Sequence, residues 1–251
     1  MYWAILSGIE GNLAAYEAVM QDLGRQSTTI SELYILGDLI GPTSSSEKLV
    51  QRVHNPRRGE LKPQVCQGWW EEQCLILHGL GRSPEPTKLT ERYGMAMVKT
   101  LWDSVSRETV GWLKSLDFGF FELDCLLIHG SSVSVEDELT PETSPLVICD
   151  RLARMGANAL FCGRSGLTFK YQLQGGSTTS SLTTLNGEQS PHTVEAPPCS
   201  VIGVGSVGRI PSHTAYTLYN PGTGQVEFKT VRYGATKGFG ALLSSNALDG
   251  F

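Results

Sequence analysis

Acidic, imidazole and guanidinium side chains stand beside glycines in several short stretches of this chain. Glu10, Asp38, His129 and Arg164 each follow or precede a glycine, and each stretch follows a short apolar run. Carboxylates and imidazoles are ligands for divalent cations, whereas the planar guanidinium of arginine pairs with carboxylates and phosphates. A metal site or an anion site is therefore the chemistry to consider. The stretches are Ser7 to Asn12, Leu36 to Asp38, Ile128 to Ser131 and Cys162 to Gly166.

The same residues also have simpler interpretations. An aspartate after a glycine commonly forms a turn or caps a helix, and an isolated histidine is often structural. Their significance therefore depends on whether the chain brings them together.

Apolar runs and helical periodicity alternate through the first two thirds of the sequence, which predicts repeated strand, loop and helix units. Each early strand ends at a polar or glycine loop. We expect strands at residues 2–6, 33–36, 74–77, 118–122, 125–128 and 159–162. We expect helices at residues 13–23, about 47–53, 89–105, 108–116 and 146–155.

The pattern changes after residue 168. Alternating segments at 169–173, 215–219 and 226–231 predict antiparallel strands in a second sheet. Residues 175–198, rich in Ser, Thr, Gly and Pro, predict a flexible loop or a weak hairpin. We therefore expect one domain over 1–234, followed by a Gly- and Ser-rich tail over 235–251 that is poorly ordered at its end.

Composition narrows the class of protein. The 251 residues carry a formal net charge of -5, which makes nucleic acid an unlikely partner. Apolar runs are too short for a membrane span, and the first residues lack the basic start of a signal peptide, so we expect a cytoplasmic protein. The six cysteines lack a CxxC spacing, which favours reduced thiols over disulfides or zinc.

A glycine pattern, Gly203-Val204-Gly205-Ser206-Val207-Gly208, matches the GxGxxG dinucleotide fingerprint after an apolar run. The fingerprint requires a helix that starts at the last glycines, and Pro211 is expected to interrupt such a helix. We therefore expect a glycine-rich turn where backbones pack closely. Elsewhere, Trp69-Trp70 beside basic residues favours either core packing or a partner-binding surface.

The order of these stretches resembles the calcineurin-like metallophosphoesterase superfamily, especially its small bacterial and archaeal phosphodiesterase branch. The resemblance extends from about Ile5 to Tyr233 and implies an α/β fold, the αββα four-layer sandwich with mixed sheets. It aligns residues 8–12, 37–42, 129–131 and 163–166 with the first, second, fourth and fifth family motifs. The third motif, Gly-Asn-His-Asp in the family, is placed at 79–82.

The resemblance also implies that most metal ligands have been replaced. Gly8 and Glu10 occupy the positions of the aspartate and the histidine of the first motif. Arg164 and Gly166 occupy the positions of the two histidines of the fifth motif. Asp38 and His129 are unchanged. A family member uses two divalent cations to hydrolyse phosphate esters. Three candidate ligands, Glu10, Asp38 and His129, cannot complete two such sites.

Two functions remain open. In the first, the chain has lost two-metal catalysis, needs no cofactor, and serves as a binding or regulatory protein for a protein partner or a phosphate-containing small ligand. Arg82 and Arg164 would then pair with Glu10 and Asp38, or join His129 in binding an anion. In the second, it is an active phosphatase or phosphodiesterase with one metal ion (Mn, Fe or Zn) held by Glu10, Asp38 and His129, the last as a possible catalytic residue.

Overall fold

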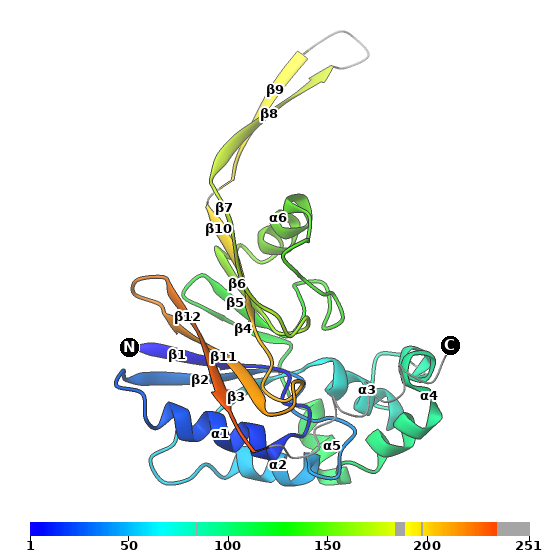
Figure 1. Ribbon diagram of the computed structural model, residues 1–251. Coiled ribbons are helices and arrows are strands. Elements are labelled where there is room, and N and C mark those ends of the chain that lie inside the picture. Colours follow the sequence, from blue (N-terminus) through cyan, green and yellow to red (C-terminus); the bar gives the residue numbers. More distant parts are fainter. Residues whose placement is uncertain (84, 184–188, 197, 235–251) are drawn as a thin grey trace, which may run out of the picture.

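The computed structural model describes residues 1–83, 85–183, 189–196 and 198–234. Two five-stranded mixed sheets form its centre (Figure 1). The first has the strand order β12-β11-β1-β2-β3, and the second has the order β4-β5-β6-β10-β7. This is the α/β class with mixed sheets that the sequence predicts.

In the first sheet, parallel strands are extended on one side by an antiparallel pair. Strands β1, β2 and β3 are parallel, and β11 runs antiparallel to β1. Its strands are β1 (Tyr2–Leu6), β2 (Ile30–Leu36), β3 (Gln64–Cys66), β11 (His213–Asn220) and β12 (Gln225–Arg232). Its helices are α1 (Leu13–Leu23), α2 (Ser46–His54), α3 (Trp69–Leu77), α4 (Thr87–Trp102) and α5 (Arg107–Lys114).

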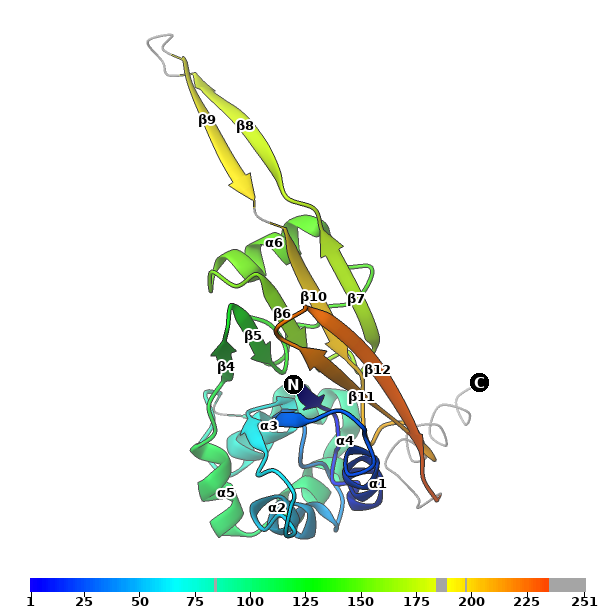
Figure 2. The ribbon, with the colours of Figure 1, turned by 90° about the vertical axis from the view of Figure 1, so that its left-hand side faces the viewer.

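In the second sheet, β5, β6 and β10 are parallel, and the two outer strands are antiparallel to their neighbours. Its strands are β4 (Gly119–Glu122), β5 (Cys125–Ile128), β6 (Ala159–Cys162), β7 (Thr168–Leu173) and β10 (Cys199–Val204), with helix α6 (Pro145–Ala153) beside them. Strands β8 (Gly176–Thr183) and β9 (Gln189–Ala196) pair only with each other among the described residues and project away from the body (Figures 1 and 2).

Three apolar layers join these elements. Alternate residues of β1 point to opposite faces, so that Trp3 and Ile5 pack between the two sheets while Ala4 and Leu6 pack against the helices. On the far side, Ile148 and Leu152 of α6 cover the outer face of the second sheet. The order of layers is helix, sheet, sheet, helix, as expected for an αββα sandwich.

The strand expected at 74–77 is wrong: Cys74–Leu77 is the end of α3. Helix α3 is buried on nearly all sides, and its second half, Cys74–Leu77, is a short continuous apolar run, which periodicity cannot distinguish from a buried strand. The true third strand is the three-residue β3, which pairs with β2. The expected location of the last strands also differs, since β11 and β12 extend the first sheet and not the second.

Residues 175–198 contain the hairpin strands β8 and β9, the second of the two structures expected there, while 184–188 and 197 lie outside the described residues. The expected tail, 235–251, also lies outside them. Within the described part, no helix is both long enough and apolar enough to cross a membrane.

The segment Gly205 to Gly208, which completes the GxGxxG pattern after β10, is a loop packed against other backbones, as expected. Gly208 N donates to Gly8 O at 2.8 Å, and a Cβ at Gly208 would lie 1.9 Å from Ile9 O. Gly208→Ala must therefore move the loop that follows β1. We expect it to lower the free energy of unfolding in urea by about 2–3 kcal/mol.

Gly222→Ala is the matched control, because a Cβ there meets nothing closer than Asn220 Oδ1 at 3.4 Å. We expect a change within about 0.5 kcal/mol. Equal losses in the two variants would show that the close approach of Gly208 to Ile9 is not important for stability.

Candidate functional site

The loops at the carboxyl ends of the parallel strands meet between the two sheets. Glu10 N, after β1, donates to Asp38 O, after β2, at 2.8 Å, and Ser7 Oγ donates to Leu36 O at 2.5 Å. In the second sheet, Gly163 N donates to His129 O at 2.8 Å. Parallel strands place their carboxyl ends at one edge, which brings the glycine-rich stretches together.

Arg209 lies at the centre of this loop cluster. Its Nε donates to Glu10 Oε1 at 2.6 Å, and its Nη2 donates to Asp38 Oδ2 at 3.0 Å. Its Nη1 donates to the backbone oxygen of Arg164 at 2.9 Å. One guanidinium therefore joins the first, second and fourth glycine-rich stretches, with its side chain only 24% exposed. Charge-assisted hydrogen bonds of this kind are stronger than neutral ones.

The side chains of Glu10 and Asp38 are buried, and the backbone of each residue is strained. Glu10 has a φ of 53° and Asp38 a φ of 50°, in the left-handed region that non-glycine residues rarely adopt. Asp38 Oδ1 accepts from Trp70 N at 2.9 Å, and the Trp70 side chain hydrogen-bonds to Glu10. Strain of this kind persists only where surrounding contacts fix it, and it is common at functional sites.

His129 completes the group. Its ring is fully buried, with Nδ1 2.9 Å from Leu36 O and Nε2 3.3 Å from Asp38 Oδ2. The second distance lies within ion-pair range, but Nε2 has no hydrogen-bond partner in the described structure. When Nδ1 donates to Leu36 O, a neutral ring directs the lone pair of Nε2 toward Asp38.

Burial and charge shift the ionisation of these groups in different directions. Burial alone would raise the pKa of Asp38, but His129 and the two arginines hold it below its ordinary value. Burial raises the pKa of Glu10 in spite of Arg209, and burial lowers the pKa of His129. Glu10 and Asp38 raise the pKa of Arg209, although its burial opposes them. The central cation is therefore permanently charged.

Glu71 is a site residue that the sequence did not indicate. It is fully buried at the start of α3, where its carboxylate accepts from Asp38 N, Gly68 N and Ile40 N at 2.8, 2.9 and 2.9 Å. Burial and the charge of Asp38 raise the pKa of Glu71 to about 8, and the backbone N–H bonds oppose that rise. This side chain fixes the Asp38 loop against the start of α3.

The placement of the third family motif at 79–82 is corrected by this geometry. The loop after β3 is the one that reaches Asp38, and it begins at Gly68, where a Cβ would lie 2.1 Å from Asp38 N. Trp69, Trp70 and Glu71 are therefore the residues that this loop and the start of α3 bring to the Asp38 loop. A tryptophan side chain offers an N–H donor and no metal ligand.

The expected pairing of Arg82 and Arg164 with the two carboxylates is also corrected, because Arg209 makes both ion pairs. Arg82 is exposed, and none of its contacts in the described part of the chain reaches Glu10 or Asp38. Arg164 does lie at the site, with 8% of its surface exposed and its guanidinium 4.9 Å from the Trp69 ring centroid. Its Nε has no hydrogen-bond partner there.

The sequence analysis does not identify Arg209 as a site residue. It follows the GxGxxG segment, far along the chain from both carboxylates, and no local pattern connects them. The sequence offers only an indirect indication of such an arginine, because two buried carboxylates require a counter-charge somewhere in the chain. Gly8 and Gly166 provide the space, since a Cβ at Gly166 would lie 2.7 Å from Arg209 Nη1.

Because Arg164 contributes a stacking contact and a backbone oxygen, we expect Arg164→Ala to have a moderate effect. The backbone acceptor for Arg209 survives the substitution, while the cation–π contact with Trp69 is lost. We expect the free energy of unfolding in urea to fall by about 1–2 kcal/mol. A loss as large as that of Arg209→Ala would contradict this ranking and make Arg164 a principal counter-ion of the site.

The residues present do not fit a two-metal centre. Glu10, Asp38 and His129 are the candidate ligands, and Arg209 lies between the two carboxylates. A cation entering here would have to displace Arg209, which remains protonated in proteins.

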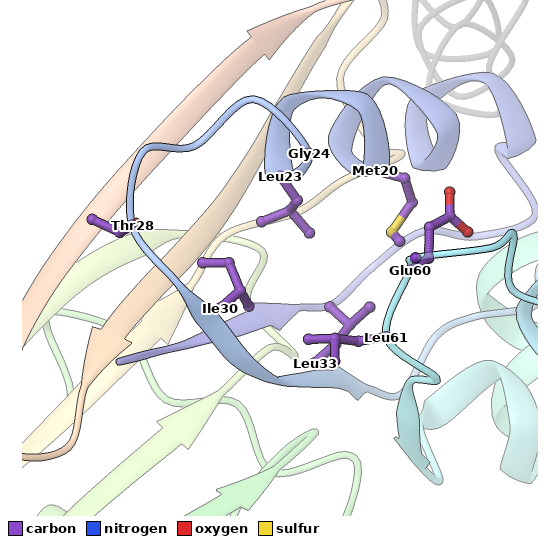
Figure 3. Close-up of a pocket in the computed structure, with 9 residues that line it drawn as sticks. Met20, Leu23, Gly24, Thr28, Ile30, Leu33, Glu60 and Leu61 are labelled. Carbon is purple, nitrogen blue, oxygen red and sulfur yellow. The ribbon is translucent and has the colours of Figure 1, made fainter.

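A separate cavity of about 210 Å³ lies away from this site (Figure 3). Met20 and Leu23 of α1, Ile30 and Leu33 of β2, and Leu61 line it. Ile30 begins β2, whereas Asp38 follows the end of that strand, so the cavity lies toward the opposite end of the sheet. It has no part in the arrangement around Arg209.

Comparisons with known proteins support the fold. No family model and no curated protein matches the sequence. A hypothetical protein from Pyrococcus horikoshii OT3 has a similar solved structure, with a TM-score of 0.68, 17% identity, and coverage of 98% of this chain and 91% of that one. A metallophosphoesterase from Sphaerobacter thermophilus gives a TM-score of 0.61, 17% identity and coverage of 93% and 89%. The chain has a metallophosphoesterase-type fold.

Proposed function

We propose that this chain is a degenerate relative of the small metallophosphoesterases that has lost two-metal hydrolysis and acts as a binding or regulatory protein in the cytoplasm. One observation carries the proposal: the Arg209 guanidinium bridges Glu10 and Asp38 at 2.6 and 3.0 Å. In a two-metal enzyme, the carboxylates at such a centre bind the cations. Here an internal arginine satisfies them.

The charges agree with that role. A divalent cation beside Arg209 and Arg164 would be repelled at close range in a buried site, where charge interactions are strong. Trp70 supplies hydrogen bonds to both carboxylates, so their oxygens are occupied by donors from the chain itself. Such a cluster can stabilise the loops without any cofactor.

The ligand that suits the retained scaffold is a phosphate-containing small molecule, with a protein partner as the other class. Of the two guanidinium groups at the site, Arg209 pairs with both carboxylates and Arg164 makes no ion pair with a described residue, and His129 Nε2 lies nearby without a hydrogen-bond partner. Arg82, at an exposed position, would contribute only at the rim. Calorimetry with inorganic phosphate and nucleotides tests anion binding, and an absence of heat would leave the protein partner as the proposal.

Turnover of a chromogenic phosphodiester in added manganese tests the loss of catalysis. We expect the wild type to show no more turnover than its Asp38→Asn variant, because Asp38 is engaged by Arg209 and Trp70. Turnover by the wild type that Asp38→Asn abolishes would contradict the proposal.

One observation favours the alternative, an active hydrolase with a single metal ion. His129 Nε2 lies 3.3 Å from Asp38 Oδ2 without a hydrogen-bond partner, and imidazole nitrogen beside carboxylate is a common ligand set for Mn, Fe or Zn. In that case Arg209 would have to leave Asp38. Manganese-dependent turnover abolished by either Asp38→Asn or His129→Gln would establish this alternative.

A further inference from the structure

The six cysteines fall into two groups by exposure. Cys66, Cys74, Cys125 and Cys162 are buried, whereas Cys149 and Cys199 are half-buried. Two of the buried thiols have acceptors inside the core, since Cys125 donates to Tyr219 Oη and Cys162 to Ile202 O. Cys149 and Cys199 are therefore the two least buried of the six cysteines.

These two cysteines are neighbours in space. Cys149 lies on α6, and Cys199 is the first residue of β10, where the chain re-enters the second sheet after the β8–β9 hairpin. The Cys149 thiol lies close enough to contribute to the raised pKa of the Cys199 thiol. Figures 1 and 2 both place α6 beside β10 near the base of the hairpin.

The packing around the pair holds α6 and β10 in this arrangement. Ile148, next to Cys149, is 1% exposed, and it shares one apolar cluster with Val201 of β10 and with Cys199 itself. The two cysteines are therefore carried by elements that a core fixes against each other. A disulfide forms readily only where the backbone already brings two cysteines close together.

We propose that Cys149 and Cys199 form a reversible disulfide when the protein meets a low-molecular-weight disulfide such as oxidised glutathione. One cysteine, as thiolate, attacks a sulfur of the reagent, forms a mixed disulfide and releases one glutathione thiolate. The second protein thiol, after losing its proton, attacks the mixed disulfide at the protein sulfur and releases the other glutathione. The protein loses two electrons and two protons, and the reagent gains them as two thiols.

The bond would connect α6 to the root of the hairpin. It closes a loop that contains β6, β7, β8 and β9, so it restricts the unfolded chain and stabilises the folded one. Burial and the neighbouring Cys149 raise the pKa of the Cys199 thiol, so the exchange should accelerate as the pH rises. This inference does not depend on the proposed function, because the pair lies apart from Arg209.

The test treats the native 251-residue chain with oxidised glutathione and then blocks free thiols with an alkylating reagent in denaturant. Peptide mass spectrometry should show a peptide with Cys149 linked to Cys199, and the four buried cysteines alkylated. The oxidised protein should melt roughly 5–10 °C higher than the reduced one, and a reductant should reverse the shift.

Cys149→Ser and Cys199→Ser are the matched variants. Each should retain glutathione as a stable mixed disulfide on its remaining thiol and show no reversible rise in melting temperature. Mixed disulfides on both cysteines of the wild type, a link to any other cysteine, or alkylation of both thiols after treatment would each overturn the proposal.

Discussion

Arg209→Ala is expected to destabilise the protein by about 3–5 kcal/mol at pH 7, measured by urea unfolding, because it leaves two buried carboxylates without their shared cation. Glu10 is 6% exposed and Asp38 is fully buried, so water cannot replace the lost partner without rearrangement. Arg209→Lys keeps the charge but lacks the planar fork that reaches both carboxylates, and it should fall between the wild type and the alanine variant.

The pH dependence of that loss has a defined sign. In the wild type, the pKa of Asp38 lies below its ordinary value of 3.8, so Asp38 adds stability above that pH and loses it as the pH falls further. Without Arg209, burial acts on both carboxyls and raises each pKa. The penalty of Arg209→Ala should therefore shrink as the pH falls from neutrality toward 4.

Arg154→Ala is the matched control, since Arg154 makes a 2.9 Å ion pair with Asp150 on the surface and is 54% exposed. Exposed pairs of this type contribute less than about 1 kcal/mol. If the Arg209 and Arg154 variants lose the same amount, Arg209 is not the counter-ion that holds the site together.

Glu71→Ala is expected to cost at least about 3 kcal/mol, because three buried backbone amides lose their acceptor and a cavity is left behind. Glu71→Gln should be nearly as damaging, since its NH₂ group would face an amide N–H and not accept from it. Two of the three amides belong to Asp38 and Ile40, so the Asp38 loop should loosen as well. Urea unfolding and amide hydrogen exchange of that loop measure both effects.

The pH trend here is opposite to that of Arg209→Ala. The raised pKa of Glu71, about 8 against an ordinary 4.5, means that its contribution is complete below pH 4.5 and declines as the pH rises toward 8. The penalty of Glu71→Ala should therefore shrink with rising pH. Glu72→Ala, at the next and less buried position, should stay within about 1 kcal/mol of the wild type. A similar loss in both variants would contradict this role for Glu71.

The alternation of apolar runs with helical periodicity predicts most of the fold, because burial on one or both faces determines the pattern of each element. Strand β6 (Ala159–Cys162) and strand β5 (Cys125–Ile128) lie at the expected residues. Strand β3, with three residues, is too short to produce a pattern. Helix α3 was predicted as a strand in its second half because it is buried on nearly all sides.

The site was only partly accessible from the sequence. Asp38, Glu10, His129 and Arg164, each of which the sequence places just after an expected strand, lie together in the structure. Arg209 and Glu71 could not be found in this way, because their partners lie far away in the chain and only the three-dimensional fold brings them close. Both satisfy buried polar groups of other loops, a requirement that leaves no periodic pattern.

The metal content of wild-type protein, purified without chelator and measured by elemental analysis, tests the central claim most directly. If Arg209 takes the place of the cations between Glu10 and Asp38, the protein should contain far less than one equivalent of manganese, iron or zinc per chain. One or two equivalents that disappear in Asp38→Asn would contradict the claim and show that these carboxylates still hold a metal centre.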